Sequence, residues 1–375
     1  MKLTRDTILA SNIRRYTKKF VAGLLSAVFF AACCPIAFAA GDSDGLYVST
    51  EMCPAAVIDH AKEDFRTMNF QDWGVPGPVK LGTPFVLNVQ NNDKLYYFPI
   101  LNSDDEIVMT YRAYKNGDSY GGIFSEALVD ELSEFETATT RSDPVKISLN
   151  PKLDIVLQSN RHVVVSKSKD ASAATEAVQL KSSAANDLSK TPVNVLSVLC
   201  TNTGNSGSQL RAISDNRFRD IPVTIRETQG NNSWCAGYVA AMIVSYKTKN
   251  VYYARDVANY AGVSTNEGIS RSKVISFAKS KGLSPRETIF DLSTQSIRNH
   301  INDDDPIYMG AIDIAHEKAH AFAITGYLQN INSGDISRFR VWNPWYDYFE
   351  TIGLDQVYIT DRGDRYEGER YIINW

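Results

Sequence analysis

The sequence predicts an α+β protein whose C-terminal part has a helical half followed by an antiparallel half. Apolar residues keep helical spacing from Cys235 to Tyr246, and the runs 253–262 and 270–281 have the same period. After these runs the chain changes to short β-type segments separated by turns. This segment of about 160 residues is long enough for its own core, so we expect two lobes with a cleft between them.

The other elements of the C-terminal part are short, because Asn, Asp, Gly or Pro interrupts each apolar run. A fourth helix is predicted over 295–301. The strands are expected at 307–312, 320–328, 338–342, 346–352 and 370–373.

Residues 41–166 are predicted to form a separate N-terminal α+β domain. Helices are expected over 54–66 and 125–135. The strands are expected at 85–89, 95–101 and 107–114, followed by a hairpin of 153–157 with 162–165. Residues 167–211 are rich in Ser, Ala, Asn and Thr, which is typical of a flexible, protease-sensitive linker. The C-terminal domain then covers 212–375.

The first 40 residues have the three parts of a secretory signal peptide. Several Lys and Arg residues precede an apolar run over 20–34, and Ala37-Phe-Ala39 provides a small-x-small cleavage signal. The run is too short for a comfortable membrane span, and no later segment is long and apolar enough, so we expect a secreted protein. Lipid attachment at Cys33, in Phe30-Ala-Ala-Cys33, is the alternative.

Composition argues against several functions. The net charge of −4 does not favour nucleic acid as the main partner. The sequence has no glycine-rich phosphate loop, HExxH or CxxC, so no metal or nucleotide cofactor is implied. Three cysteines remain after the leader, namely Cys53, Cys200 and Cys235. Pairing of Cys53 with Cys200 stays open, and an odd count leaves one thiol free.

The segment from Gln229 to Tyr238 has the features of a cysteine acyl-transfer site. Cys235 is predicted in the first turn of a helix, where the dipole and unpaired N–H groups stabilise a thiolate, and Asn232 or Ser233 would be the N-cap. Gln229, six residues earlier, could donate one hydrogen bond to an oxyanion, with the Cys235 N–H as the other donor. Taken alone, Cys235 would be interpreted as a small buried apolar residue.

The partners that such a cysteine needs follow in the sequence. His320 begins a β-type run and could act as the base, with His316 as an alternative, whereas His300 is predicted to be a surface residue. Asn343 follows the strand 338–342 and could accept the second imidazole N–H. Trp345 would then shield that hydrogen bond from water.

These segments resemble the staphopains, secreted bacterial cysteine peptidases of the papain superfamily. The resemblance covers about Ala212 to the C-terminus and rests on three segments: Thr224–Tyr238, His320–Gly326 and Val341–Trp345. It implies a papain-like two-lobed catalytic domain. In that domain Cys235 is the nucleophile, His320 the base and acid, Asn343 the residue that orients the ring, and Gln229 the oxyanion donor, with Trp345 and Trp234 in support. Trp234 precedes the cysteine here, whereas in plant papains the tryptophan follows it.

The expected function is therefore that of a secreted cysteine endopeptidase made as a zymogen. Residues 41–166 would cover the cleft as an inhibitory propeptide, and activation would cleave between about 196 and 218, with Arg211 an attractive site. The expected partners are protein substrates and the chain's own propeptide, and a dedicated protein inhibitor is left open. The alternatives are a papain-like cell-wall amidase, a non-catalytic secreted binding protein, and an N-terminal domain that is retained as a binding module.

Overall fold

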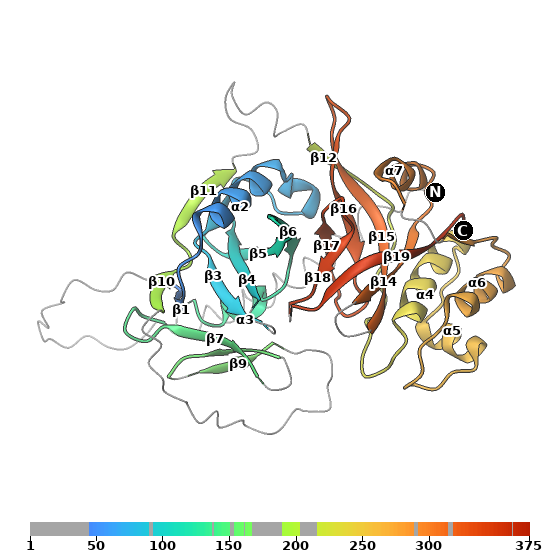
Figure 1. Ribbon diagram of the computed structural model, residues 1–375, viewed down its shortest axis with the longest axis horizontal. Helices are drawn as coiled ribbons and strands as arrows, with labels where there is room; N and C mark the ends of the chain where they lie inside the picture. The colour runs from blue at the N-terminus through green and yellow to red at the C-terminus, as the bar shows by residue number, and fades with distance from the viewer. Residues whose placement is uncertain are drawn as a thin grey trace, which may run out of the picture. The chain divides into compact units, whose positions relative to one another are not determined.

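The computed structural model describes residues 45–89, 93–136, 139–150, 154–160, 162–166, 190–202, 216–288, 292–313, 318–361 and 363–375 (Figure 1). The predicted signal peptide, Cys33 and most of the predicted linker lie outside these ranges. Residues Asp44–Trp375 form one compact unit. In the part of the chain that the structure describes, no helix is long and apolar enough to cross a membrane.

The N-terminal region contains two sheets and short helices. The five-stranded sheet has the order β10 (Thr191–Asn194), β1 (Tyr47–Thr50), β7 (Val145–Leu149), β8 (Ile155–Gln158) and β9 (Val163–Val165). The six-stranded sheet has the order β11 (Val198–Asn202), β2 (Val79–Gly82), β4 (Lys94–Leu101), β5 (Ile107–Asn116) and β6 (Ser119–Ser125), with β3 (Phe85–Asn88) beside β4. The helices are α2 (Ala55–Thr67), the 3₁₀ helix η1 (Phe70–Trp73) and α3 (Val129–Ser133).

Two expectations for this region were wrong. The helix expected over 125–135 is shorter, because β6 ends at Ser125 and α3 has only five residues. The linker expected over 167–211 contains two strands, because β10 pairs with β1 and β11 pairs with β2. Both strands are short and do not alternate apolar with polar residues, so they gave no strand pattern, and each is held by its partner's hydrogen bonds.

The described part of the C-terminal region has four helices and one antiparallel sheet. The helices are α4 (Cys235–Thr248), α5 (Ala254–Ala261), α6 (Arg271–Ser280) and α7 (Thr294–Asn302). The main path of the eight-stranded sheet is β13 (Arg286–Thr288), β19 (Arg365–Ile373), β14 (Ile307–Asp313), β15 (Lys318–Asn330), β16 (Ile336–Trp342) and β17 (Phe349–Ile352). Off this path, β12 (Asn216–Asp220) pairs with β15 and β18 (Val357–Ile359) pairs with β19. The expected order of helices before strands holds for β14 to β19, but β12 precedes α4 and β13 precedes α7.

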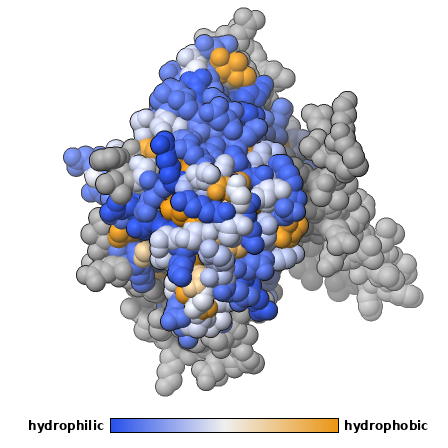
Figure 2. Space-filling model, turned by 90° about the vertical axis from the view of Figure 1, so that its right-hand side faces the viewer, coloured by the Kyte–Doolittle hydropathy of each residue, from blue (hydrophilic) through white to orange (hydrophobic). Residues whose placement is uncertain are grey.

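The helix that begins at Cys235 lies inside the protein. Every residue from Ala236 to Ser245 is buried, which explains why its sequence lacks a polar face. By contrast, the right-hand side of Figure 1, where α5 and α6 lie, is mostly hydrophilic, with hydrophobic residues in small separate groups (Figure 2). The helices α5 and α6 therefore form the outer layer over α4.

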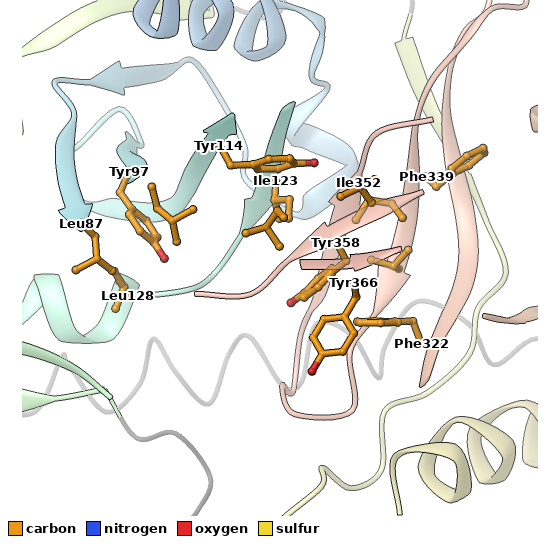
Figure 3. Packing of buried hydrophobic residues seen from close by; sticks show 14 of the residues in the cluster. Leu87, Tyr97, Tyr114, Ile123, Leu128, Phe322, Phe339, Ile352, Tyr358 and Tyr366 are labelled. Atoms are coloured by element: carbon orange, nitrogen blue, oxygen red, sulfur yellow. The ribbon is translucent and has the colours of Figure 1, made fainter. Parts of the chain in front are cut away.

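Alternate residues of β15 join different hydrophobic clusters, as expected for a strand. Ala321 and Ala323 pack in the cluster of α4, α5 and α6, whereas Phe322 and Ile324 belong to a second cluster that includes both regions of the chain. Figure 3 shows members of the second cluster: Leu87, Tyr97, Tyr114, Ile123 and Leu128 from the N-terminal region, and Phe322, Phe339, Ile352, Tyr358 and Tyr366 from the C-terminal region.

Candidate active site

The N-terminus of α4 carries Cys235 and has no side-chain cap. The N-cap is Trp234, so the cap expected from Asn232 or Ser233 was wrong. Asn232 instead accepts the Trp234 backbone N–H at 3.1 Å and donates to the Tyr238 hydroxyl at 3.1 Å. No side chain caps the first turn of α4, and the N–H groups of Cys235 and Ala236 point to the Cys235 sulfur, whereas that of Gly237 donates to the Trp234 carbonyl at 2.7 Å.

The sulfur of Cys235 lies beside strand β15. Burial raises the pKa of the Cys235 thiol, while the backbone N–H groups of Ala236, Ala321 and Cys235 itself act in the opposite direction. Cys235 is partly exposed to solvent, so the rise in pKa reflects crowding by neighbours rather than complete exclusion of water. Since Ala321 directly follows His320, the sulfur lies next to the strand residue that was predicted as the base.

His320 and Asn343 form a buried hydrogen-bonded pair. His320 Nε2 and Asn343 Oδ1 are 2.9 Å apart, and their residues are 5% and 0% exposed. Asn343 lies at the end of β16, whose residue Trp342 is paired with Ala323 of β15, so the hairpin brings together residues 23 positions apart. The amide oxygen accepts, so Nε2 carries the proton and Nδ1 is the acceptor nitrogen of the neutral ring.

The surroundings keep the His320 ring neutral and in place. Burial lowers the pKa of His320 from its ordinary value of 6.5 to about 4, although the hydrogen bond with Asn343 acts in the opposite direction. The Trp345 ring stacks on the imidazole at 4.1 Å between centroids. The Trp345 backbone N–H also donates to Asn343 Oδ1 at 3.1 Å. Trp345 therefore contacts both members of the pair, as the sequence suggested.

Gln229 is tied to the same turn. Its backbone N–H donates to the Pro344 carbonyl at 2.7 Å, and its side-chain Nε2 donates to the Asn232 carbonyl at 2.6 Å. An amide nitrogen has two N–H groups, so one remains for a ligand. The Gln229 side chain is 6% exposed, and its Oε1 has no hydrogen-bond partner in the structure. Trp234 anchors the neighbouring loop by donating Nε1–H to the Ser264 carbonyl at 2.8 Å.

The other candidate residues lie elsewhere. His316 is outside the described residues. His300 is half-buried, and its Nδ1 is 3.0 Å from Asp305 Oδ2. Cys53 and Cys200 are both free thiols, so the disulfide that the sequence left open is not formed. Within the described ranges, no group of three or more His, Cys, Asp or Glu side chains is arranged to hold a metal ion.

Sequence reasoning missed two residues behind Asn343. Tyr358 accepts the Asn343 Nδ2–H at 3.0 Å and donates its own hydroxyl to Glu350 Oε2. Glu350 is fully buried in β17. A carboxylate within the apolar run predicted as strand 346–352 was the available signal, because a charge there needs a partner.

A cysteine at the start of a helix, beside a strand whose histidine is hydrogen-bonded to an asparagine at the end of the next hairpin arm, is the arrangement expected of a cysteine peptidase. Comparisons with known proteins give the same class. Residues 215–372 match the family model described as staphopain peptidase C47. Staphopain A of Staphylococcus aureus strain MRSA252 is 25% identical over 325 residues, which cover 76% of this chain and 78% of that protein.

An extracellular cysteine protease of Staphylococcus epidermidis strain ATCC 12228 is 25% identical over 324 residues, covering 76% of this chain and 77% of that protein. A crystal structure from Bacillus anthracis, titled C39-like peptidase, covers 42% of this chain and 95% of its own at 12% identity, with a TM-score of 0.28. The sequence matches confirm the predicted resemblance to the staphopains and indicate that the chain is a cysteine peptidase.

Proposed function

We propose that the chain is the precursor of a secreted endopeptidase that hydrolyses peptide bonds in proteins. Cys235 is the nucleophile, His320 the base and acid, and Asn343 the residue that orients the imidazole. The observation that carries the proposal is the buried 2.9 Å hydrogen bond from His320 to Asn343, next to the Ala321 N–H that acts on the Cys235 thiol. The similarity to an extracellular cysteine protease supports secretion.

The proposed reaction is acyl transfer through a thioester. The Cys235 sulfur attacks the peptide carbonyl carbon while its proton goes to His320 Nδ1. The oxyanion accepts from the Cys235 N–H and from the second Nε2–H of Gln229. His320 then protonates the leaving amine, and water, deprotonated by His320, hydrolyses the thioester. Asn343 keeps the proton on Nε2 throughout, so that Nδ1 remains free to exchange protons.

We also propose that residues 41–166 are an inhibitory propeptide that covers the cleft of a papain-like, two-lobed domain. The alignment with staphopain A is longer than the region that the family model matches, so it includes part of the N-terminal region. The strands β11 and β12 are paired in sheets on either side of residues 203–215. Activation cleavage would therefore fall within 203–215, a range that includes Arg211.

Kinetics of single variants test the proposed roles. Cys235→Ala should abolish hydrolysis of a fluorogenic peptide by the activated protein, and His320→Ala should nearly do so. Gln229→Ala should lower kcat on the order of 10²–10³-fold, because it removes one oxyanion donor. Asn343→Ala should have a milder effect, since it transfers no proton. Titration with E-64 gives the concentration of active sites, and full activity in His320→Ala would refute the assignment.

A further inference from the structure

A buried polar chain continues behind the His320–Asn343 pair. Asn343 Nδ2 donates to the Tyr358 hydroxyl at 3.0 Å, and this hydroxyl donates to Glu350 Oε2. Tyr358, Asn343 and Glu350 are each 0% exposed. The three residues come from β18, the turn after β16, and β17, so the chain of hydrogen bonds connects separate parts of the sheet. Figure 3 shows Tyr358 beside Phe322 and Tyr366, which both pack against His320.

The direction of each hydrogen bond in this chain follows from Glu350. An ionised carboxylate only accepts, so Tyr358 must donate to it and offer its lone pair to Asn343. Asn343 can then donate only through Nδ2, which leaves Oδ1 for His320 Nε2. Without the Tyr358 acceptor, the Trp345 N–H that donates to Oδ1 at 3.1 Å would be left to oppose a rotation of the Asn343 amide, which presents its NH₂ group to the imidazole and favours the wrong tautomer.

The ionised form of Glu350 has a buried counter-ion. Arg112 of strand β5 is 0% exposed, and its guanidinium lies 3.7 Å from Glu350 Oε1. The same guanidinium donates to the Ile359 carbonyl at 2.6 Å, one residue after Tyr358. A buried carboxylate without such a partner would be costly. Burial raises the pKa of Glu350 to about 7, while the Arg112 guanidinium acts in the opposite direction, so above that pH Glu350 is the carboxylate that accepts from Tyr358.

We infer that Tyr358 and Glu350 are positioning residues that set the orientation of the Asn343 amide and, through it, the tautomer of His320. This inference rests on the proposed function. Both side chains are fully buried behind Asn343, so both should influence the rate of the chemical step and not the binding of substrate.

The test measures kcat and KM of the activated protein for Tyr358→Phe, with active sites titrated. We expect kcat to fall about tenfold and KM to stay within about twofold, because the variant leaves the Asn343 Nδ2–H without its acceptor. Tyr371→Phe is the matched control, since Tyr371 also loses a buried hydroxyl bond, to Gln356 Oε1 at 2.5 Å in the same sheet. It should keep the wild-type kcat.

A double-mutant cycle separates positioning from a general structural effect. If Tyr358 acts through Asn343, Tyr358→Phe should lower kcat no further in an Asn343→Ala background. Glu350→Gln keeps an acceptor oxygen for Tyr358 and should retain more activity than Glu350→Leu, which provides a second test if Tyr358→Phe folds poorly.

Two results would overturn the inference: a wild-type kcat in Tyr358→Phe, or an equal loss in both backgrounds. Should Tyr358→Phe not fold, equal activity in Glu350→Gln and Glu350→Leu would overturn it as well. Hydrolysis by Cys235→Ala would instead refute the proposed function itself, so the two failures are distinguishable.

Discussion

The charged and polar side chains of the site are placed where water is scarce. His320 is 5% exposed and Asn343 is fully buried, so their hydrogen bond does not compete with solvent. Burial lowers the pKa of His320 and raises that of Cys235. Both shifts favour a neutral thiol and a neutral imidazole, which is consistent with the inactive precursor that we propose.

The low pKa of His320 predicts how stability changes with pH. The unfolded chain binds a proton at His320 near pH 6.5, whereas the folded chain does so only near pH 4. His320 therefore destabilises the fold as the pH falls from about 6.5 towards 4. Between pH 7.5 and 5 this should cost about 2 kcal/mol relative to a chain that lacks the imidazole.

Urea unfolding of the full-length Cys235→Ala chain, with and without His320→Gln, measures this cost. Burial also raises the pKa of Glu350, to about 7, and that group acts with the opposite sign. Both chains contain Glu350, so its contribution cancels in the difference. If the two chains lost equal stability on acidification, His320 would be accessible to protons in the folded state.

At the level of elements, the sequence predicted those parts that carry their own periodicity. The helix α4 begins at Cys235, where a helix was predicted to start. The strand β15 begins at Lys318, close to the predicted start at His320. Their apolar residues repeat at the helical and strand periods over many positions. Gln229 lies shortly before α4, His320 lies near the start of β15 and Asn343 directly follows β16, so all three could be placed relative to predicted elements.

The missed features depend on partners that are distant in the sequence. The strands β10 and β11 exist through pairing with β1 and β2, and their own residues do not alternate between apolar and polar. The contact of Tyr358 with Asn343 depends on how β18 lies beside the turn after β16. No local pattern encodes such a placement, because it is fixed by sheet register and packing.

Strand β12 is held close to β15 at Gly326, and this predicts a sensitive position. A Cβ atom on Gly326 would lie 2.7 Å from the Arg219 carbonyl oxygen and 3.0 Å from the Asp220 Cα. Both are backbone atoms of β12, which cannot move without breaking the pairing. We expect Gly326→Ala to lower the free energy of unfolding by about 1–3 kcal/mol.

Urea unfolding of full-length Cys235→Ala chains gives this value. Gly268→Ala is the control, because the nearest atom to its added Cβ would be 3.9 Å away. Equal stabilities for the two glycine variants would show that β12 can shift at little cost.

On the scale of the whole molecule, buried charges join the N-terminal region to the C-terminal sheet. Arg338 of β16 is 5% exposed, pairs with Asp64 of α2 and donates to the Gly122 carbonyl at 2.6 Å. Arg112 of β5 reaches Glu350 and the Ile359 carbonyl in the same way. Each region therefore buries charged side chains of the other region. Separating the two regions would expose these side chains to water and break their ion pairs.

Asp64→Ala should consequently destabilise the full-length chain far more than a typical surface change. It leaves the Arg338 guanidinium buried without its carboxylate and removes the acceptor of the Tyr111 hydroxyl, 2.6 Å away. We expect the free energy of unfolding to fall by about 3–5 kcal/mol in the Cys235→Ala background, measured by urea unfolding.

Asp59→Ala is the matched control, because Asp59 lies on the same helix and is exposed. Asp59→Ala should stay within about 0.5 kcal/mol of the parent. If Asp64→Ala matched it, the Arg338–Asp64 pair would contribute nothing to joining the two regions, and the packing of the shared hydrophobic cluster would have to hold them alone.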